Sequence, residues 1–429
     1  MARCLKDAPS PRTSASEEVE RTVSEMLKRI GSGGARAIRD YSRMLDGWDP
    51  PSFRVGAREI ADAESRVSDE LKQHITFAQE QVRGFARAQR DTLCDLEVET
   101  LPGVVLGHRH IPVDAVGSYV PGGRYPMLAS SFMTVVVPKV AGVGRVVACA
   151  PPFRGEGIHP AMLYAMSTSG ADEIVCLGGV QGLAALAFGL DGEIEPVDMI
   201  VGAGNAYVAE AKRQLFGEVG IDLLAGPTEI LVVADDGADP DIVAADLLGQ
   251  AEHGPTSQAV FISTSRRLAE AVLQRLDALL ETWPTAETAG KAWADYGIAV
   301  VAEGDEEAIE LVNAYASEHL EVHVRPDRLD DWFAQLRNYG SLFLGDQATV
   351  VYGDKAIGTN HVLPTSRAAR YTGGLWVGKF LKTCTYQRLT EEGTRLVAPA
   401  AAAISDAEMM AGHAITARMR LDRLVRGAE

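Results

Sequence analysis

The chain has 429 residues and a formal net charge of −18, from 41 basic and 59 acidic side chains. This length predicts two or more domains, each able to bury an apolar core. A strongly acidic chain repels phosphate backbones and anionic lipid, so we expect neither a nucleic-acid nor a membrane partner. The sequence has no long apolar run, no apolar leader and only five scattered cysteines. These features favour a cytoplasmic protein with reduced thiols.

The N-terminal third is predicted to be helical. Residues 1–16 are polar and rich in Pro and Ser, which predicts a loose arm. Residues 16–90 then show a helical pattern that ends in a long charged helix over residues 68–90.

From about Leu106 onward, short runs rich in Val and Ile alternate with amphipathic segments, the rhythm of parallel sheets covered by helices. The predicted strands are Arg145–Ala150, Glu173–Leu177, Asp198–Val201, Glu229–Ala234, Ala259–Ser263, Ala299–Ala302 and Ser341–Leu344. The predicted helices between them are Ala206–Leu215, Asp241–Gln250, Arg267–Glu281 and Glu306–Tyr315.

This alternation predicts an α/β fold with two Rossmann-like parallel sheets, one on either side of Thr228. Helical extensions are expected at both ends. The expected division is an arm (1–25), a discontinuous α/β domain (26–118 with 229–378), an inserted α/β domain (119–228) and a C-terminal helical tail (379–429).

The glycine motifs do not identify a nucleotide site. The segments 142–144 and 202–204 each have only the first two glycines of GxGxxG, so the usual phosphate-binding turn is absent. Residues 119–123 (YVPGG) predict a tight turn. Periodicity alone therefore places ligands only at the carboxyl ends of strands.

Two pairs of polar residues lie at predicted helix ends. Gln250 and His253 share one helix face and can offer an oxygen and a nitrogen to one ion, or can simply cap the helix. Glu318 and His319 close another helix and offer two proton acceptors of different basicity. The alternative for His319 is a favourable interaction with the helix dipole.

Two further segments carry candidate functional residues. Residues 353–365 combine turn formers with polar side chains and predict a functional loop. Glu408 and His413 are five residues apart, about 140° around a helix, so their joint use requires a bend between them. The alternative is that both are solvated surface residues.

Taken together and in order, these segments resemble the histidinol dehydrogenase family. The resemblance runs from about residue 20 to the end, and it implies an enzyme that uses zinc and NAD. The matching stretches are GSYVPGG (117–123), LGGVQGLAALAFG (177–189), VGAGNAYVAEAKRQLFG (201–217), IDLLAGPTEILVVAD (221–235), DLLGQAEHG (246–254), SEHLEV (317–322), GDKAIGTNHVLPT (353–365) and EMMAGH (408–413).

The resemblance also implies a site assignment, one residue at a time. The zinc ligands it implies are Gln250, His253, Asp354 and His413. His413 would come from the tail of the other subunit, which implies an interlocked homodimer with a shared site. The NAD contacts it implies are Tyr119, Gln181 and Asn205, and the substrate contacts are Thr228, His361 and Glu408.

In this family Glu318 and His319 match the acid/base pair. The reaction that the resemblance implies oxidises a primary alcohol to a carboxylate through a bound aldehyde, with two NAD and four electrons. His319 would take the hydroxyl proton, and Glu318 would activate water for the second oxidation. A closed, dry site would retain the aldehyde.

The chain departs from the family pattern after residue 365. Lys379 stands where an acid is usual, and Arg367 where a small residue is usual. Added positive charge disfavours cationic histidinol and favours an anionic substrate. This segment looks like the sulfopropanediol dehydrogenase branch, which oxidises 2,3-dihydroxypropane-1-sulfonate to 3-sulfolactate. The alternatives are that both cations lie outside the pocket, that the substrate is L-histidinol, or that the chain is a catalytically silent binding protein.

Overall fold

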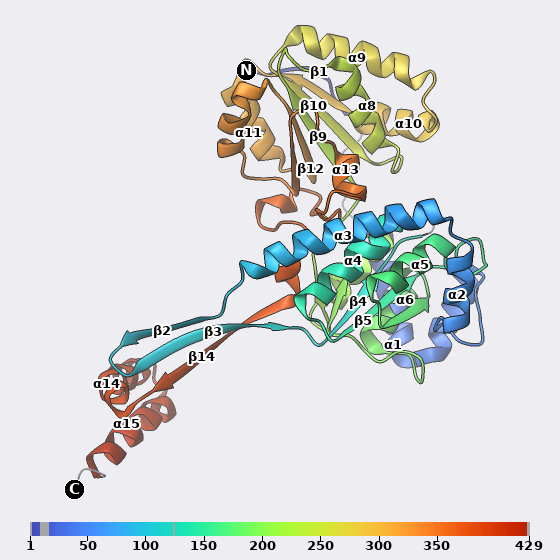
Figure 1. Ribbon diagram of the computed structural model, residues 1–429. Coiled ribbons are helices and arrows are strands. Elements are labelled where there is room, and N and C mark those ends of the chain that lie inside the picture. The colour runs from blue at the N-terminus through green and yellow to red at the C-terminus, as the bar shows by residue number, and fades with distance from the viewer. Residues whose placement is uncertain (1, 9–16, 123–124, 427–429) are drawn as a thin grey trace.

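The computed structural model describes residues 2–8, 17–122 and 125–426. Two parallel sheets, each with helices packed around it, lie one above the other, and a narrow antiparallel arm projects away from them (Figure 1). This confirms the predicted α/β fold with parallel sheets. No helix in the described ranges is long and apolar enough to cross a membrane.

The first sheet contains five parallel strands in the order β6-β5-β4-β7-β8. Its strands are β4 (Ala115–Tyr119), β5 (Arg145–Ala150), β6 (Glu173–Cys176), β7 (Met199–Val201) and β8 (Gly220–Ile221). Its helices are α4 (Leu128–Ala141), α5 (Pro160–Ser169), α6 (Gly179–Phe188) and α7 (Ala206–Leu215). Helices cover both faces, which explains why β4 and β5 are almost entirely buried.

The second sheet has six strands in the order β1-β11-β10-β9-β12-β13, with only β1 antiparallel. Its strands are β1 (Arg3–Lys6), β9 (Glu229–Ala234), β10 (Gln258–Ser263), β11 (Ile298–Val301), β12 (His319–His323) and β13 (Ser341–Leu344). Its helices are α8 (Pro240–Ala251), α9 (Arg266–Leu280), α10 (Ala286–Tyr296), α11 (Asp305–Tyr315), α12 (Leu329–Gln335) and α13 (Val350–Lys355). Within each sheet the parallel strands follow the same order, with the first strand at the centre.

Three N-terminal helices cover the first sheet rather than the second. They are α1 (Glu17–Asp46), α2 (Ala57–Ser65) and α3 (Asp69–Asp91). Helix α1 packs on α6 and α7, α2 on α5, and α3 on α4. The expected grouping of residues 26–118 with 229–378 is therefore wrong for these helices, because their apolar faces are buried against the first sheet's own helices.

The N-terminal segment also differs from the expected loose arm. Residues Arg3–Lys6 form β1, which pairs antiparallel with β11 at the edge of the second sheet. The remainder of the predicted arm, residues 1 and 9–16, lies outside the described residues, as does Gly123 of the predicted 119–123 turn.

The C-terminal tail is only partly helical. It begins with β14 (Leu381–Leu389), which pairs with β3 (Val104–Pro112), and β3 pairs in turn with β2 (Leu96–Leu101). Helices α14 (Glu391–Ala407) and α15 (Ala411–Arg426) pack against each other at the far end of this arm (Figure 1). The expected wholly helical tail was wrong because β14 is an exposed antiparallel strand, with no buried apolar run to mark it.

The first sheet has a topological switch point between β4 and β7, where the connections leave in opposite directions. In such sheets the carboxyl-end crevice at the switch point is the usual ligand site. Gly202 follows β7 with a φ of 113°, and a Cβ there would lie 2.1 Å from the carbonyl oxygen of Tyr119. Only glycine therefore allows the two strand ends to approach this closely.

We predict that Gly202→Ala destabilises the fold by about 1–3 kcal/mol, because the new methyl group meets backbone at a positive φ. Thermal unfolding measures the change. Gly31→Ala is a matched control within α1, where an added Cβ has no neighbour within 4 Å and alanine favours the helix. Equal melting temperatures for the two variants would contradict the close-approach argument.

Candidate active site

A cavity of about 470 Å³ lies where the carboxyl ends of β4 and β7 face the amino ends of β9 and β12. The first sheet contributes loop residues 121–122 and 203–206. The second sheet contributes Thr228, Glu318 and His319, among others. The switch point of one sheet is therefore closed by the strand beginnings of the other.

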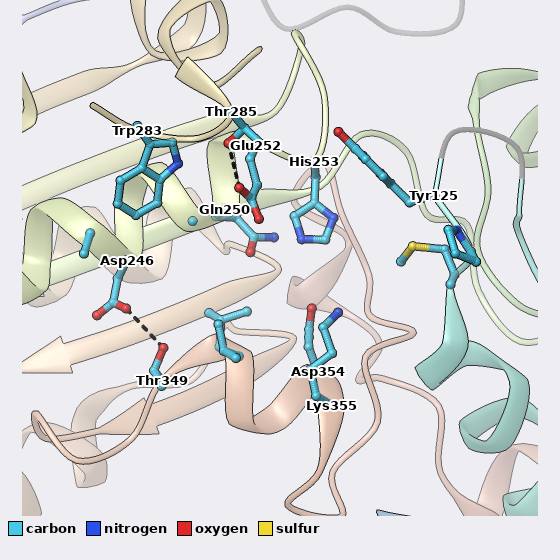
Figure 2. A pocket seen from close by; sticks show the side chains of 16 residues that line it. Tyr125, Asp246, Gln250, Glu252, His253, Trp283, Thr285, Thr349, Asp354 and Lys355 are labelled. Atoms are coloured by element: carbon cyan, nitrogen blue, oxygen red, sulfur yellow. Dashed lines mark hydrogen bonds between the residues drawn. The ribbon is translucent and has the colours of Figure 1, made fainter. Parts of the chain in front are cut away.

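A second cavity of about 570 Å³ adjoins the first, and the two share Tyr125, Met127, His253 and Asp354. Figure 2 shows Asp354 and Lys355 extending from α13 toward Gln250 and His253 at the end of α8. Two of the predicted metal ligands, His253 and Asp354, therefore lie at the junction of the two cavities, and Gln250 lines the second.

A chain of hydrogen bonds orients the carboxylate of Glu318. The amide nitrogen of Gln250 donates to the hydroxyl of Thr228 at 2.5 Å, and this hydroxyl donates to Oε2 of Glu318 at 2.6 Å. The same oxygen accepts the N–H of Glu229 at 2.9 Å. Two other segments, Gln250 on α8 and residues 228–229 at the start of β9, thereby fix one carboxylate.

His319 begins β12 instead of closing a helix, because α11 ends at Tyr315 and Ala316 adopts a left-handed conformation. Its Nδ1 lies 3.1 Å from the carbonyl oxygen of Glu229. A proton on Nδ1 satisfies that carbonyl and leaves Nε2 as the acceptor. Nε2 is buried, has no hydrogen-bond partner within the described chain, and lies 3.4 Å from Oδ1 of Asp354. The ring is therefore oriented through Nδ1, with Nε2 beside Asp354 at the cavity.

The electrostatics of this group are strongly coupled. Burial raises the pKa of Glu318 to about 7, against the opposing effects of His319 and Thr228. Burial lowers the pKa of His319, but the neighbouring Glu318 and Asp354 outweigh it and raise that pKa to about 9. The pKa of Asp354, although raised by burial, falls to about 2 because His319 stabilises the carboxylate. Perturbed acid/base groups at a cavity are typical of catalytic sites.

Three of the four predicted zinc ligands meet at the cavity junction. Gln250 and Asp354 are buried and His253 follows the end of α8, and all three line the same cavity. Because the nitrogen of Gln250 is held by Thr228, its Oε1 is the atom left to coordinate. An amide oxygen, an imidazole and a carboxylate suit zinc. The buried Nε2 of His319, beside Asp354, is a further polar atom at this site that has no hydrogen-bond partner among the described residues.

The fourth predicted ligand lies elsewhere in this chain. His413 and the predicted substrate contact Glu408 are exposed, at the far end of the projecting arm (Figure 1). The expected bend between them is present, because α14 ends at Ala407 and α15 begins at Ala411. A single chain therefore does not bring these two residues to its own cavity.

The predicted NAD contacts are divided. Asn205 lines the first cavity and caps α7, accepting the N–H groups of Tyr207 and Val208. Tyr119 and Gln181 lie nearby but are buried and do not line either cavity. The hydroxyl of Tyr119 accepts the N–H of Gly179, and the amide of Gln181 donates to Asp46 at 2.8 Å.

The predicted substrate contacts are divided too. Thr228 and His361 line the first cavity, and burial lowers the pKa of His361 to about 4, so this ring is neutral near pH 7. Arg367 is exposed and Lys379 donates to Thr372 at 2.7 Å, and neither residue lines either of the two cavities. The prediction that these two cations face the substrate is not supported by their positions.

Sequence reasoning missed Lys355. It follows Asp354 on α13, lines the second cavity and is its only Lys or Arg among the described lining residues. The first cavity has neither residue type in the part of its lining that the structure describes. The GDKAIG stretch contains this lysine, but the sequence alone predicts only a polar functional loop there.

A second polar cluster lies beneath the site. Asp246, Glu321 and His323 offer ligand-type atoms that lie within 4.8 Å of one another. Glu321 and His323 are buried in β12, and Asp246 lines the second cavity from α8. Sequence reasoning missed this cluster, because Asp246 precedes Glu321 by 75 residues, and Glu321 and His323 are hidden within a strand.

Known proteins resemble the chain over nearly its full length. A sequence profile described as histidinol dehydrogenase matches residues 10–421. A "Histidinol dehydrogenase homolog" from Shouchella clausii is 52% identical and covers 95% of each chain. "Sulfopropanediol 3-dehydrogenase" from Ruegeria pomeroyi is 47% identical, over 97% of this chain and 95% of its own.

The resemblance extends to three dimensions. The crystal structure of histidinol dehydrogenase from Elizabethkingia anophelis is 32% identical, with a TM-score of 0.91 over 97% of this chain and 95% of that one. Sequence and fold thus agree with the geometry of the site. The chain is an enzyme and belongs to the histidinol dehydrogenase family.

Proposed function

We propose that this enzyme catalyses the zinc-dependent, four-electron oxidation of a small anionic primary alcohol to a carboxylate, with two NAD as hydride acceptors. The substrate we propose is 2,3-dihydroxypropane-1-sulfonate, which yields 3-sulfolactate. The observation that carries this proposal is the meeting of Glu318, His319 and Asp354 at one cavity with a lysine beside them. The 47% identity to a sulfopropanediol dehydrogenase supports the same substrate class.

The proposed zinc site consists of Gln250, His253 and Asp354, completed by His413 of the partner subunit. When bound, zinc would supply a Lewis acid that holds and polarises a substrate oxygen. The chain's own contribution is to present one amide oxygen, one imidazole and one carboxylate from two helices at the cavity junction.

The proton transfers are assigned to the buried pair. His319 accepts the proton of the substrate hydroxyl at Nε2, because Nδ1 is held by the carbonyl of Glu229. Glu318 accepts a proton from water in the second oxidation, since its raised pKa makes it a stronger base than an ordinary carboxylate. Thr228 keeps that carboxylate in place during both steps.

The preference for an anion rests on Lys355. Lys355 directly follows the proposed ligand Asp354 and lines the cavity that the three proposed ligands of this chain share. A sulfonate gains charge-assisted hydrogen bonds from an ammonium group, whereas cationic histidinol is repelled by it. Lys355 thus takes the role that the sequence alone assigned to Arg367 and Lys379.

The substrate is tested by incubating zinc-loaded protein and NAD with either the dihydroxypropanesulfonate or L-histidinol, and following NADH absorbance. We expect turnover of the sulfonate with two NADH per molecule oxidised. Turnover of histidinol alone would exclude the sulfonate and support histidine biosynthesis instead.

In the same assay, Lys355→Ala should raise the KM for the sulfonate by about 10- to 100-fold, the cost of one charge-assisted hydrogen bond. Lys382→Ala, on the exposed strand β14, is the control and should have little effect. A comparable KM increase in Lys379→Ala, with Lys355→Ala normal, would return anion recognition to position 379.

The separate roles proposed for His319 and Glu318 give a further prediction. His319→Ala should slow the first hydride transfer by about 100-fold or more, the usual contribution of a general base. Glu318→Gln keeps an oxygen for Thr228 and should leave the first oxidation largely intact while impairing oxidation of the aldehyde. Rapid-quench measurement of each half-reaction separates these outcomes, and equal loss of both in Glu318→Gln would contradict the assignment.

We further propose that the active enzyme is a homodimer in which each tail completes the site of its partner. The projecting arm leaves Glu408 and His413 far from their own cavity. The strand β2 is exposed along its length. The helices α14 and α15 and the turn between them expose apolar side chains such as Ile404, Met409 and Met419. Exposed apolar surface of this kind is typical of an interface that a single chain does not cover.

Mixing two variants that each fail to complete the oxidation to the carboxylate tests this arrangement, with carboxylate formation as the measured activity. Glu318→Ala removes the proposed base next to the cavity, and His413→Ala removes the proposed zinc ligand on the C-terminal tail. If sites are shared, a mixed dimer contains one site built from two unaltered parts, so random association should restore about one quarter of wild-type activity. Co-expression with two different affinity tags provides the mixed dimer, and no recovery in the purified mixed species would contradict a shared site.

A further inference from the structure

The cluster of Asp246, Glu321 and His323 connects three elements of the second sheet. Nε2 of His323 lies 3.4 Å from Oε2 of Glu321 and 3.9 Å from Oδ2 of Asp246. The other carboxylate oxygens face the start of α13. Oε1 of Glu321 accepts the N–H of Val350 at 2.8 Å, and Oδ1 of Asp246 accepts the hydroxyl of Thr349 at 3.1 Å (Figure 2).

These residues repeat the arrangement of the proposed zinc site one layer below it. On α8, Asp246 precedes Gln250 by four residues, so both lie on one helix face. On β12, Glu321 follows His319 by two residues, so both lie on one face of the strand. On α13, the anchored Val350 precedes Asp354 by four residues.

We infer that Asp246, Glu321 and His323 form a buried clamp that positions α8, β12 and α13, and thereby Gln250, His319 and Asp354 above them. The inference rests on the proposed zinc site, whose ligands these positioning residues would orient. None of the three contacts a proposed zinc ligand in the interactions described above. We therefore expect them to orient the ligands by fixing the backbones of α8, β12 and α13. Residues behind a metal site that orient its ligands commonly change metal affinity by about 10- to 100-fold when they are removed.

The internal chemistry of the clamp supports a positioning role. Two carboxylates side by side in a buried site cannot both ionise cheaply, and a shared proton or an imidazolium compensates them. Burial and, after it, the neighbouring carboxylate of Glu321 together raise the pKa of Asp246 to about 7. A proton held between the carboxylates converts their repulsion into an attraction between α8 and β12.

The test compares zinc affinities of purified, full-length variants by competition with a chromophoric chelator, alongside zinc content by mass spectrometry. Asp246→Ala should bind zinc about 10- to 100-fold more weakly, because α8 loses its connection to Glu321 and Thr349. Asp246→Asn retains an oxygen for Thr349 and an N–H for Glu321, so it should remain within about threefold of the wild type by the energetics of one neutral hydrogen bond.

Asp235→Ala is the matched control. Asp235 is another buried carboxylate of the same sheet. Its backbone N–H donates to the carbonyl oxygen of His323, but its side chain lies outside the clamp and accepts the N–H groups of Gly237 and Arg325. This variant should lose thermal stability and keep wild-type zinc affinity. It separates loss of a buried carboxylate from loss of the clamp.

Each result has a defined consequence. Equal zinc affinity in the wild type and Asp246→Ala overturns the clamp while leaving the proposed function intact. Two zinc ions per wild-type chain, one of them lost in Asp246→Ala, overturns the clamp in favour of a second metal site. A wild-type protein that binds no zinc overturns the proposed function and the clamp together. Weakened binding in Asp246→Ala with rescue by Asn supports the clamp.

Discussion

The parallel pairing of β9 with β12 is the constraint on which the rest of the site depends. Its register sets His319 opposite Ile230 and leaves Glu318 beside the first N–H of β9. These segments are about 90 residues apart in the chain, so no local preference brings them together. Once they pair, the carboxylate of Glu318 and the ring of His319 are both fixed by the backbone of Glu229. A base held by a backbone group keeps its position without relying on mobile side chains, which favours repeated proton transfer at one place.

The opposed orientation of the two sheets explains the composition of the cavity. The first sheet presents carboxyl-end loops at its switch point, which is the usual place for a nucleotide. The second sheet presents the amino ends of β9 and β12, and these carry the proposed acid/base residues instead of a phosphate-binding turn. The carboxyl ends of the second sheet are closed by Asp235 and its partners Arg325 and Gly237. The two sheets therefore contribute opposite ends to one cavity, the first its switch-point loops and the second its strand beginnings, although both have the same strand order.

The sequence predicted those strands whose burial leaves a plain apolar run. Arg145–Ala150, Glu229–Ala234 and Ser341–Leu344 match the structure residue for residue. The sequence did not predict β12, because Glu321 and the two histidines interrupt the apolar pattern. These polar side chains are buried because their contacts with other polar groups compensate them. The exposed strands β2 and β14 were missed for the opposite reason, since nothing about them is buried. Local rules fail where a tertiary network compensates a polar side chain, which is where functional residues concentrate.

The site residues follow the same logic. From the residues alone, Gln250, His253, Glu318 and His319 stayed open between capping and catalysis, because a pattern does not reveal which distant segments meet. The charged residues of the sequence indicated a cation near the proposed substrate, but not which cation the fold places at the cavity. Lys379 indicated a cation near the substrate, yet its half-buried ammonium lies near Asp222, whose carboxylate binds Lys212 and the N–H of Gly202. Lys379 therefore lies beside Thr372 and Asp222 and lines neither of the two cavities. Lys355, one residue beyond Asp354, is the cation that the fold places at the cavity, so the inference of an anionic substrate survives on a different residue.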